Sequence, residues 1–251
     1  MKYKKHKSYW QQDIRKREYV RIFLEGMTLV FVLSYVFYGT LWAVPFLSPL
    51  LIGYVSIRTL ELIKKKQSQF RLQFKNAIQS LSAALHVGYS AENAMRETYR
   101  ELQLLYQKEE RILREFRYMN HQLDMNMALE GILMAFAKRT KDEEVQLFVT
   151  VFSMAKRSGG DMIAIIRSAI TRMTEQVEME QDMQTTIAAK KLEFQIMTVI
   201  PIGILLYMKV GFPEFLDVLY GNVTGVLLMS VCLIVYIVTY VLGRRIVEVE
   251  V

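Results

Sequence analysis

The sequence predicts an all-α membrane protein, in which two hairpins of transmembrane helices flank a cytoplasmic bundle of about six helices. Two long stretches are almost free of charge: from Ile22 to Ile57 only Glu25 is charged, and from Asn222 to Gly243 no residue is. Uncharged apolar runs of roughly 18 residues or more are typical of membrane-spanning helices. The segment between them, residues 64–191, contains no proline and places apolar residues at helical spacing.

The first apolar stretch, residues 22–59, is expected to form two spans, near residues 22–39 and 41–58. Its uncharged part, Gly26 to Ile57, has 32 residues and would measure about 48 Å as a single helix. A hydrocarbon core is only about 30 Å thick. The chain can turn at Gly39-Thr40 or at the prolines Pro45 and Pro49. The alternative is one span followed by a segment lying at the membrane surface.

The second hairpin is expected within residues 194–243, with spans near 194–210 and 222–243. Phe194 to Met208 is apolar and contains Pro201 and Gly203. Lys209 and the turn-rich stretch Gly211 to Glu214 follow. Because Lys209 lies near an end of the span, its amine can reach the membrane surface.

The distribution of lysine and arginine predicts the orientation. These residues gather in the tail 1–21, at Lys64–Lys66, at Lys190-Lys191 and in the tail 244–251, whereas Lys209 is the only one between paired spans. By the positive-inside rule, both termini and the central segment face the cytoplasm. The net charge is +7. We interpret the basic residues as topogenic charges that also contact the lipid membrane. We do not expect nucleic-acid binding, because the basic segments lack interleaved aromatic residues.

Glycines and capping residues divide the central segment into helices. Gly88 is expected to stop one helix and Ser90 to cap the next, and Asp124 to cap the helix that carries Leu129. The stretch Arg157, Ser158, Gly159, Gly160 predicts another stop, after which Asp161 would cap a long amphipathic helix. That helix is expected to run almost to Lys191 and to continue into the third span.

Residues that could carry chemistry are sparse. The histidines His6, His86 and His121 lack the spacing of metal ligands, and no glycine-rich phosphate loop or nucleophile–base arrangement occurs. Acidic pairs such as Asp142-Glu143 fall at expected helix starts, where they complement the helix dipole. We therefore expect no cofactor, no metal and no enzymatic activity. A transporter is the alternative, for which Pro201 and Gly203 within a span are the one indication.

Two stretches resemble the type II secretion system F family, and most closely its tight-adherence (Flp-type) pilus proteins TadB and TadC. One is Phe74 to Ala94, FKNAIQSLSAALHVGYSAENA, and the other runs from Ala128 to Pro201 and includes Arg157 to Gly160. In this comparison Gly88, Ser90, Asp124, Arg157, Gly159, Gly160, Asp161 and Pro201 are structural motif positions and not catalytic ones.

The resemblance implies a non-enzymatic platform protein of the bacterial inner membrane, which neither forms nor cleaves covalent bonds. Its expected partners are a cytoplasmic secretion ATPase, a paralogous platform protein and pilin subunits, and it is expected to work as a homo- or hetero-oligomer. The larger members of the family carry two copies of the domain, whereas this chain has one clear copy. That difference favours the single-domain, tight-adherence type.

Overall fold

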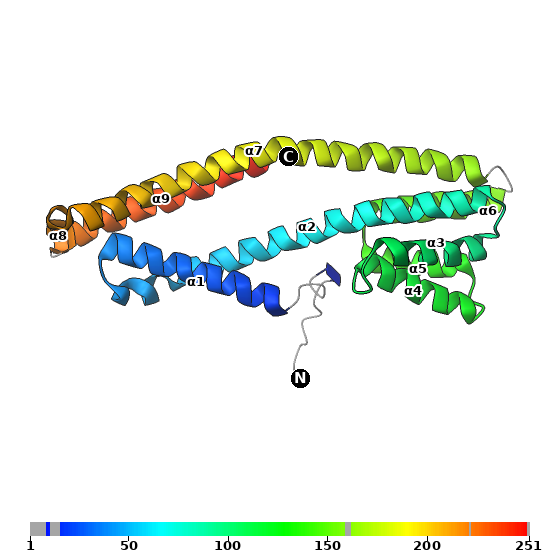
Figure 1. The fold of residues 1–251 in the computed structure, drawn as a ribbon, viewed down its shortest axis with the longest axis horizontal. Helices are drawn as coiled ribbons and strands as arrows, with labels where there is room; N and C mark the ends of the chain where they lie inside the picture. Colours follow the sequence, from blue (N-terminus) through cyan, green and yellow to red (C-terminus); the bar gives the residue numbers. More distant parts are fainter. Residues whose placement is uncertain (1–8, 11–15, 159–161, 221, 250–251) are drawn as a thin grey trace. The chain divides into compact units, whose positions relative to one another are not determined.

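The computed structural model describes residues 9–10, 16–158, 162–220 and 222–249, and these residues are helical apart from short connections (Figure 1). The expected all-α class is thus confirmed for the described part of the chain. Its elements are α1 (Lys16–Tyr38), η2 (Leu41–Ala43), α2 (Val44–His86), α3 (Ala91–Leu105), α4 (Arg111–Asp124), α5 (Leu129–Thr140), α6 (Glu143–Ser158), α7 (Met162–Gly211), α8 (Pro213–Tyr220) and α9 (Val223–Val249).

The chain forms two compact units, which we describe separately. The helical unit comprises residues 1–14 and 62–179, and the apolar unit comprises residues 15–61 and 180–251. The chain passes from one unit to the other within α2 and again within α7. Residues 180–191, at the end of the expected domain 64–191, group with the apolar unit. The expected N-terminal tail is also divided between the two units.

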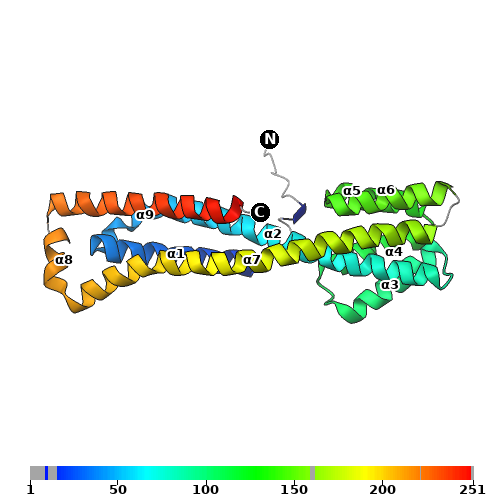
Figure 2. The ribbon, with the colours of Figure 1, turned by 90° about the horizontal axis from the view of Figure 1, so that it is seen from above.

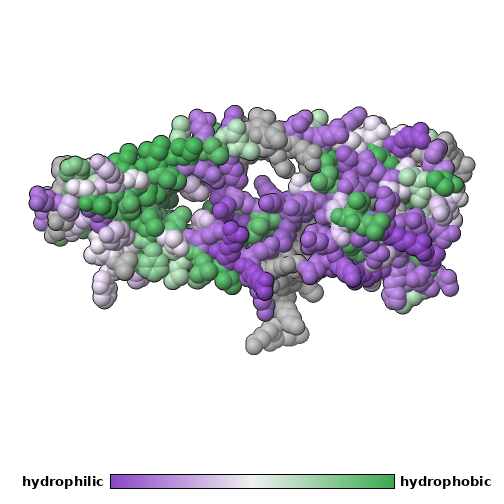
Figure 3. Space-filling model, viewed as in Figure 1, coloured by the Kyte–Doolittle hydropathy of each residue, from purple (hydrophilic) through white to green (hydrophobic). Residues whose placement is uncertain are grey.

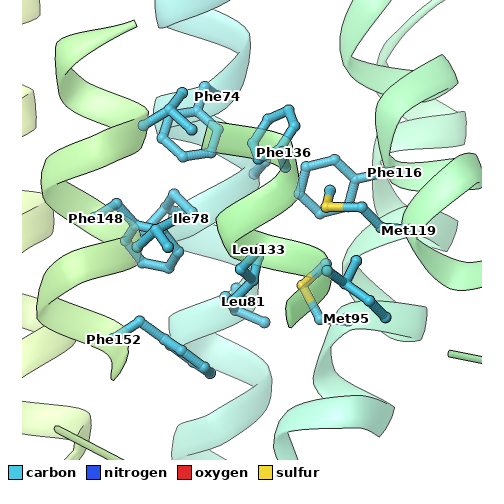
Figure 4. Close-up of a cluster of buried hydrophobic side chains, with 14 of the residues drawn as sticks. Phe74, Ile78, Leu81, Met95, Phe116, Met119, Leu133, Phe136, Phe148 and Phe152 are labelled. Carbon is cyan, nitrogen blue, oxygen red and sulfur yellow. The ribbon is translucent and has the colours of Figure 1, made fainter. Parts of the chain in front are cut away.

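The core of the helical unit contains one apolar face of α2. Phe74 is almost fully buried, and its ring centroid lies 5.8 Å from that of Phe148 in α6 and 5.9 Å from that of Phe136 in α5 (Figure 4). Around it, α3 packs on α4, α4 on α5, and α5 on α6. Figure 2 shows α5 and α6 side by side. Each buried side chain of this size contributes about 1.5–3 kcal/mol relative to exposure, so this cluster holds the unit together.

The end of α2 and the start of α3 have the local geometry that the sequence predicts. Gly88 has a φ of 98°, a left-handed conformation that favours glycine. Its N–H donates to the Leu85 carbonyl (3.1 Å), and the N–H of Tyr89 donates to the Ala84 carbonyl (3.2 Å). This pair of bonds is a Schellman motif. The Ser90 hydroxyl then accepts a hydrogen bond from the Asn93 N–H and caps α3.

Within the described residues, the apolar unit contains four helical segments that are long and apolar enough to cross a membrane: Lys16–Tyr38, a part of Val44–His86, Ala188–Gly211 and Val223–Ile246. Figure 3 shows hydrophobic residues over this unit. The first turn occurs where expected, because α1 ends at Tyr38 and Gly39 takes a φ of 67°. The Ser34 hydroxyl donates to the Thr40 carbonyl (2.8 Å) and secures the turn. Pro45 and Pro49, the other candidate turning points, fall in the first turns of α2.

The second pair of apolar helices differs in one detail from the expectation. The turn-rich stretch after Gly211 is mostly a short helix, α8. The expected long helix is confirmed, since α7 runs from Met162 to Gly211 and includes Pro201. Between α7 and α9, the Tyr236 hydroxyl donates to the Thr198 carbonyl (2.8 Å), and the rings of Phe194 and Tyr240 stack with centroids 5.6 Å apart.

Candidate functional site: an ion-pair cluster joining the four apolar helices

Glu61 of α2 is the centre of an ion-pair cluster. Its Oε1 accepts from Nη2 of Arg244 in α9 (2.9 Å) and lies 3.7 Å from Nζ of Lys191 in α7. Its Oε2 accepts from Nη1 of Arg58, one turn earlier in α2 (3.1 Å). A single carboxylate therefore holds cations from three of the four apolar helices.

Arg58 extends the cluster to the remaining helix. Its Nη2 lies 3.8 Å from Oε2 of Glu25 in α1, and Nε of Arg21 donates to Oε1 of the same carboxylate (3.1 Å). The Tyr54 hydroxyl accepts a hydrogen bond from Nε of Arg58 (3.2 Å) and fixes the direction of its guanidinium group. Together, Glu25, Arg58 and Glu61 connect α1, α2, α7 and α9.

The cluster lies where the apolar stretches meet charged sequence. Glu61 follows the uncharged run that ends at Ile57, and Arg244 follows the run that ends at Gly243. These ion pairs bring together four cations (Arg21, Arg58, Lys191, Arg244) and two carboxylates (Glu25, Glu61). Glu61 and Arg244 are only 25% and 17% exposed at the side chain, so water screens this pair less than a surface ion pair.

The charged groups of this cluster can hold the four apolar helices together. Its carboxylates are paired with guanidinium and ammonium groups. Because these charge-assisted bonds join different helices, they oppose separation of the helices. Among the residues that the structure describes, no three histidine, cysteine or acidic side chains gather as metal ligands. The single Cys232 is exposed on α9.

Lys209 makes a second connection, near the two turns of the hairpins. Its Nζ donates to the Tyr35 carbonyl of α1 and lies 3.6 Å from the centroid of the Tyr35 ring. The Tyr220 ring is also close, at 4.9 Å, and the Tyr220 hydroxyl donates to the Val36 carbonyl. Instead of only reaching toward the membrane surface, Lys209 attaches the end of α7 to the end of α1.

The prediction that Asp124 caps a helix is wrong. Asp124 is the last residue of α4, and α5 begins after Ala128, which is its N-cap. Asn126, with a φ of 58°, turns the chain between the two helices. The Asp124 carboxylate instead accepts from Nη2 of Arg96 in α3 (2.9 Å).

The remaining motif residues have mixed outcomes. Arg157 lies in the last turn of α6, whereas Gly159, Gly160 and Asp161 lie outside the described residues, so the stop and cap there stay predictions. Pro201 lies inside α7. The acidic residues Asp142 and Glu143 fall at the start of α6, as expected, and Asp142 has a further role as its cap.

Asp142 caps α6 and is nearly buried. Its Oδ1 accepts from the N–H groups of Glu144 (3.1 Å) and Val145 (3.5 Å). Nε of Arg71 in α2 donates to its Oδ2 (3.0 Å). The signal for this cap was present, since an acidic residue directly before a helix is a common N-cap.

No protein-family model, no curated protein and no solved structure matches this chain.

Proposed function

We propose that this chain is a platform protein of the bacterial inner membrane, of the type II secretion F kind and closest to the tight-adherence pilus branch. It would couple a cytoplasmic secretion ATPase to the addition of pilin subunits. The observation that carries the proposal is the continuity of α2 and α7. Each helix contains both a segment apolar enough to cross a membrane and a polar segment of the helical unit.

The ion-pair cluster supports a mechanical role. A force applied to α2 or α7 would reach α1 and α9 through Glu61, Arg58 and Glu25, because these side chains connect all four apolar helices. The four spans would then respond together. In this proposal the helical unit faces the cytoplasm, where it would contact the ATPase, and a paralogous platform protein or a second copy would lie beside it in the membrane.

Cysteine labelling tests the proposed orientation. In a Cys232→Ser background, Thr40→Cys and Asn222→Cys should react with a membrane-impermeant maleimide added to intact cells. Gln146→Cys, which lies on an exposed part of α6, should react only after the cells are opened. Labelling of Gln146→Cys from outside would contradict the orientation.

A deletion strain tests the coupling role itself. It should lack surface pili while the purified ATPase keeps its own activity, and the wild-type gene should restore piliation. A six-residue Gly-Ser insertion after Gln181, within α7, should not restore it. The same insertion after Gln107, between α3 and α4, is the matched control and should.

Both variants must accumulate in the membrane at equal levels for this comparison. Normal piliation in the deletion strain would overturn the proposal. Substrate flux by the purified chain in proteoliposomes would instead favour the transporter alternative.

A further inference from the structure

Two aromatic residues near the N-terminus are bound by the helical unit. Trp10 is only 6% exposed and belongs to the hydrophobic core of this unit. Its ring meets Phe70 of α2 edge-on, with centroids 5.2 Å apart, and the Tyr9 ring meets Trp10 in the same way at 5.0 Å. A tryptophan buried to this extent removes a large apolar area from water, which is the main source of affinity for such a segment.

Polar groups hold Tyr9 in a defined position. Its hydroxyl donates to Oε1 of Glu115 in α4 (2.8 Å), and Nη2 of Arg111 donates to its carbonyl (2.9 Å). The Arg111 guanidinium also lies 3.9 Å from the centroid of the Tyr9 ring, within the range of a cation–π contact. Burial, and then the Glu115 carboxylate, raise the pKa of Tyr9, so the hydroxyl remains a donor at neutral pH.

The groups that contact the two residues are themselves fixed by the helical unit. Glu115 is almost buried, and its Oε2 accepts from Nη2 of Arg139 in α5 (2.9 Å). Phe70 stacks on Phe74 with centroids 6.2 Å apart. Three helices therefore contribute to the site: α2 supplies the apolar ring of Phe70, α4 supplies Arg111 and Glu115, and α5 supplies Arg139.

The sequence around the two residues is otherwise highly polar. Lys2, Lys4, Lys5 and Lys7 precede them, and Arg15, Lys16 and Arg17 follow. A segment that served only as topogenic charge would have no need of an aromatic pair. The hydrogen bond to Glu115 requires the Tyr9 hydroxyl, and the cation–π contact with Arg111 requires the Tyr9 ring.

We infer that the helical unit contains a binding site for a Tyr-Trp segment, and that this chain's own N-terminus, anchored at Tyr9 and Trp10, is its ligand. Tyr9 and Trp10 are then a docking motif. The inference depends only on contacts within the helical unit and stands apart from the platform proposal.

Fluorescence of the intact chain gives the first test. The sequence has two tryptophans, and Trp42 is 88% exposed. In a Trp42→Phe variant, Trp10 is the sole reporter. We expect blue-shifted emission and at least threefold slower quenching by iodide than for a free peptide of residues 2–15. Emission and quenching equal to those of the free peptide would overturn the inference.

Binding between separate molecules gives the second test. A chain that lacks residues 2–15 is purified in detergent, its helix content is checked by circular dichroism, and a fluorescein-labelled peptide of residues 2–15 is added. Fluorescence anisotropy should report saturable binding. A Trp10→Ala peptide should bind at least about tenfold more weakly, and a Tyr9→Phe peptide should lie between the two.

The Trp10→Ala peptide carries the same charge as the original peptide. It is therefore the matched control for purely electrostatic binding of the basic peptide to the truncated chain. Equal affinity of these two peptides would overturn the inference, as would the absence of binding to a truncated chain that keeps its helix content.

Discussion

The helical unit and the apolar unit are both made of helices, but they bury their apolar residues differently. In the helical unit the large side chains of α2, α4, α5 and α6 point into one core, and Phe74, Phe116, Phe136 and Phe148 are almost fully buried. In the apolar unit a smaller cluster around Val36 and Leu233 is buried, while many apolar side chains of α7 and α9 stay exposed.

This difference indicates two sources of cohesion. The helical unit is stabilised by removing apolar surface from water, as in a soluble domain. The exposed apolar surface of the other unit suits contact with lipid, where packing, ion pairs and hydrogen bonds must fasten the helices because lipid tails are as apolar as the side chains. The Glu61 cluster and the Lys209 contact supply such fastening.

The largest effect is expected for Phe74→Ala in the helical unit. Removing this ring leaves a cavity between Phe136 and Phe148, and should cost about 3–5 kcal/mol of unfolding free energy. Urea titration in mild detergent, followed by near-ultraviolet circular dichroism, measures the loss. Leu227→Ala, at a position 64% exposed in α9, is the control and should change stability by less than about 0.5 kcal/mol. Equal losses for both variants would break the contrast between the units.

A smaller effect is expected for Glu61→Gln in the apolar unit. The substitution leaves Arg58, Lys191 and Arg244 close together without their shared carboxylate. Because the site is partly exposed, we expect a loss of about 1–2 kcal/mol, between the values for surface and buried pairs. Thermal unfolding in detergent at low and high salt measures it. Glu97→Gln, which removes the exposed pair of Glu97 with Arg100, should be nearly neutral, and the same cost for both would contradict the role of the cluster.

The smallest effect is expected for Gly88→Ala. No atom lies within 4 Å of the position of an added Cβ, so the cost comes only from the left-handed backbone and should be about 1 kcal/mol. Urea titration of the helical unit measures it. Gly131→Ala is a control inside a helix, at a position that is also open, and should be neutral or slightly stabilising. A neutral Gly88→Ala would show that this turn tolerates another conformation.

Features that depend on neighbouring residues could be predicted from the sequence. The break at Gly39, the stop at Gly88 and the cap at Ser90 each follow from the conformational preference of one residue next to a helical pattern. Asp124 shows the limit of this reasoning. Its side chain suits a cap, but Arg96, 28 residues earlier, binds it, and the helix that it was expected to start begins after Ala128.

Features that depend on distant residues could not be predicted. Glu61 meets Arg244, 183 residues later, and Tyr9 meets Glu115, 106 residues later. Nothing in the local pattern of either pair specifies the partner, because the contacts exist only after several helices have packed. The same holds for Trp10, which from the sequence alone belonged to a basic tail.

Pro201 has a consequence for how α7 can move against α9. Proline has no N–H, so the Met197 carbonyl loses its usual donor within α7. One residue further, the Thr198 carbonyl receives the hydroxyl of Tyr236 from α9. A slide of one helical turn, about 5.4 Å, would break that hydrogen bond. The hydrogen bond therefore favours one lengthwise register of α7 against α9, and the missing helical bond at Pro201 makes this part of α7 the easiest to bend.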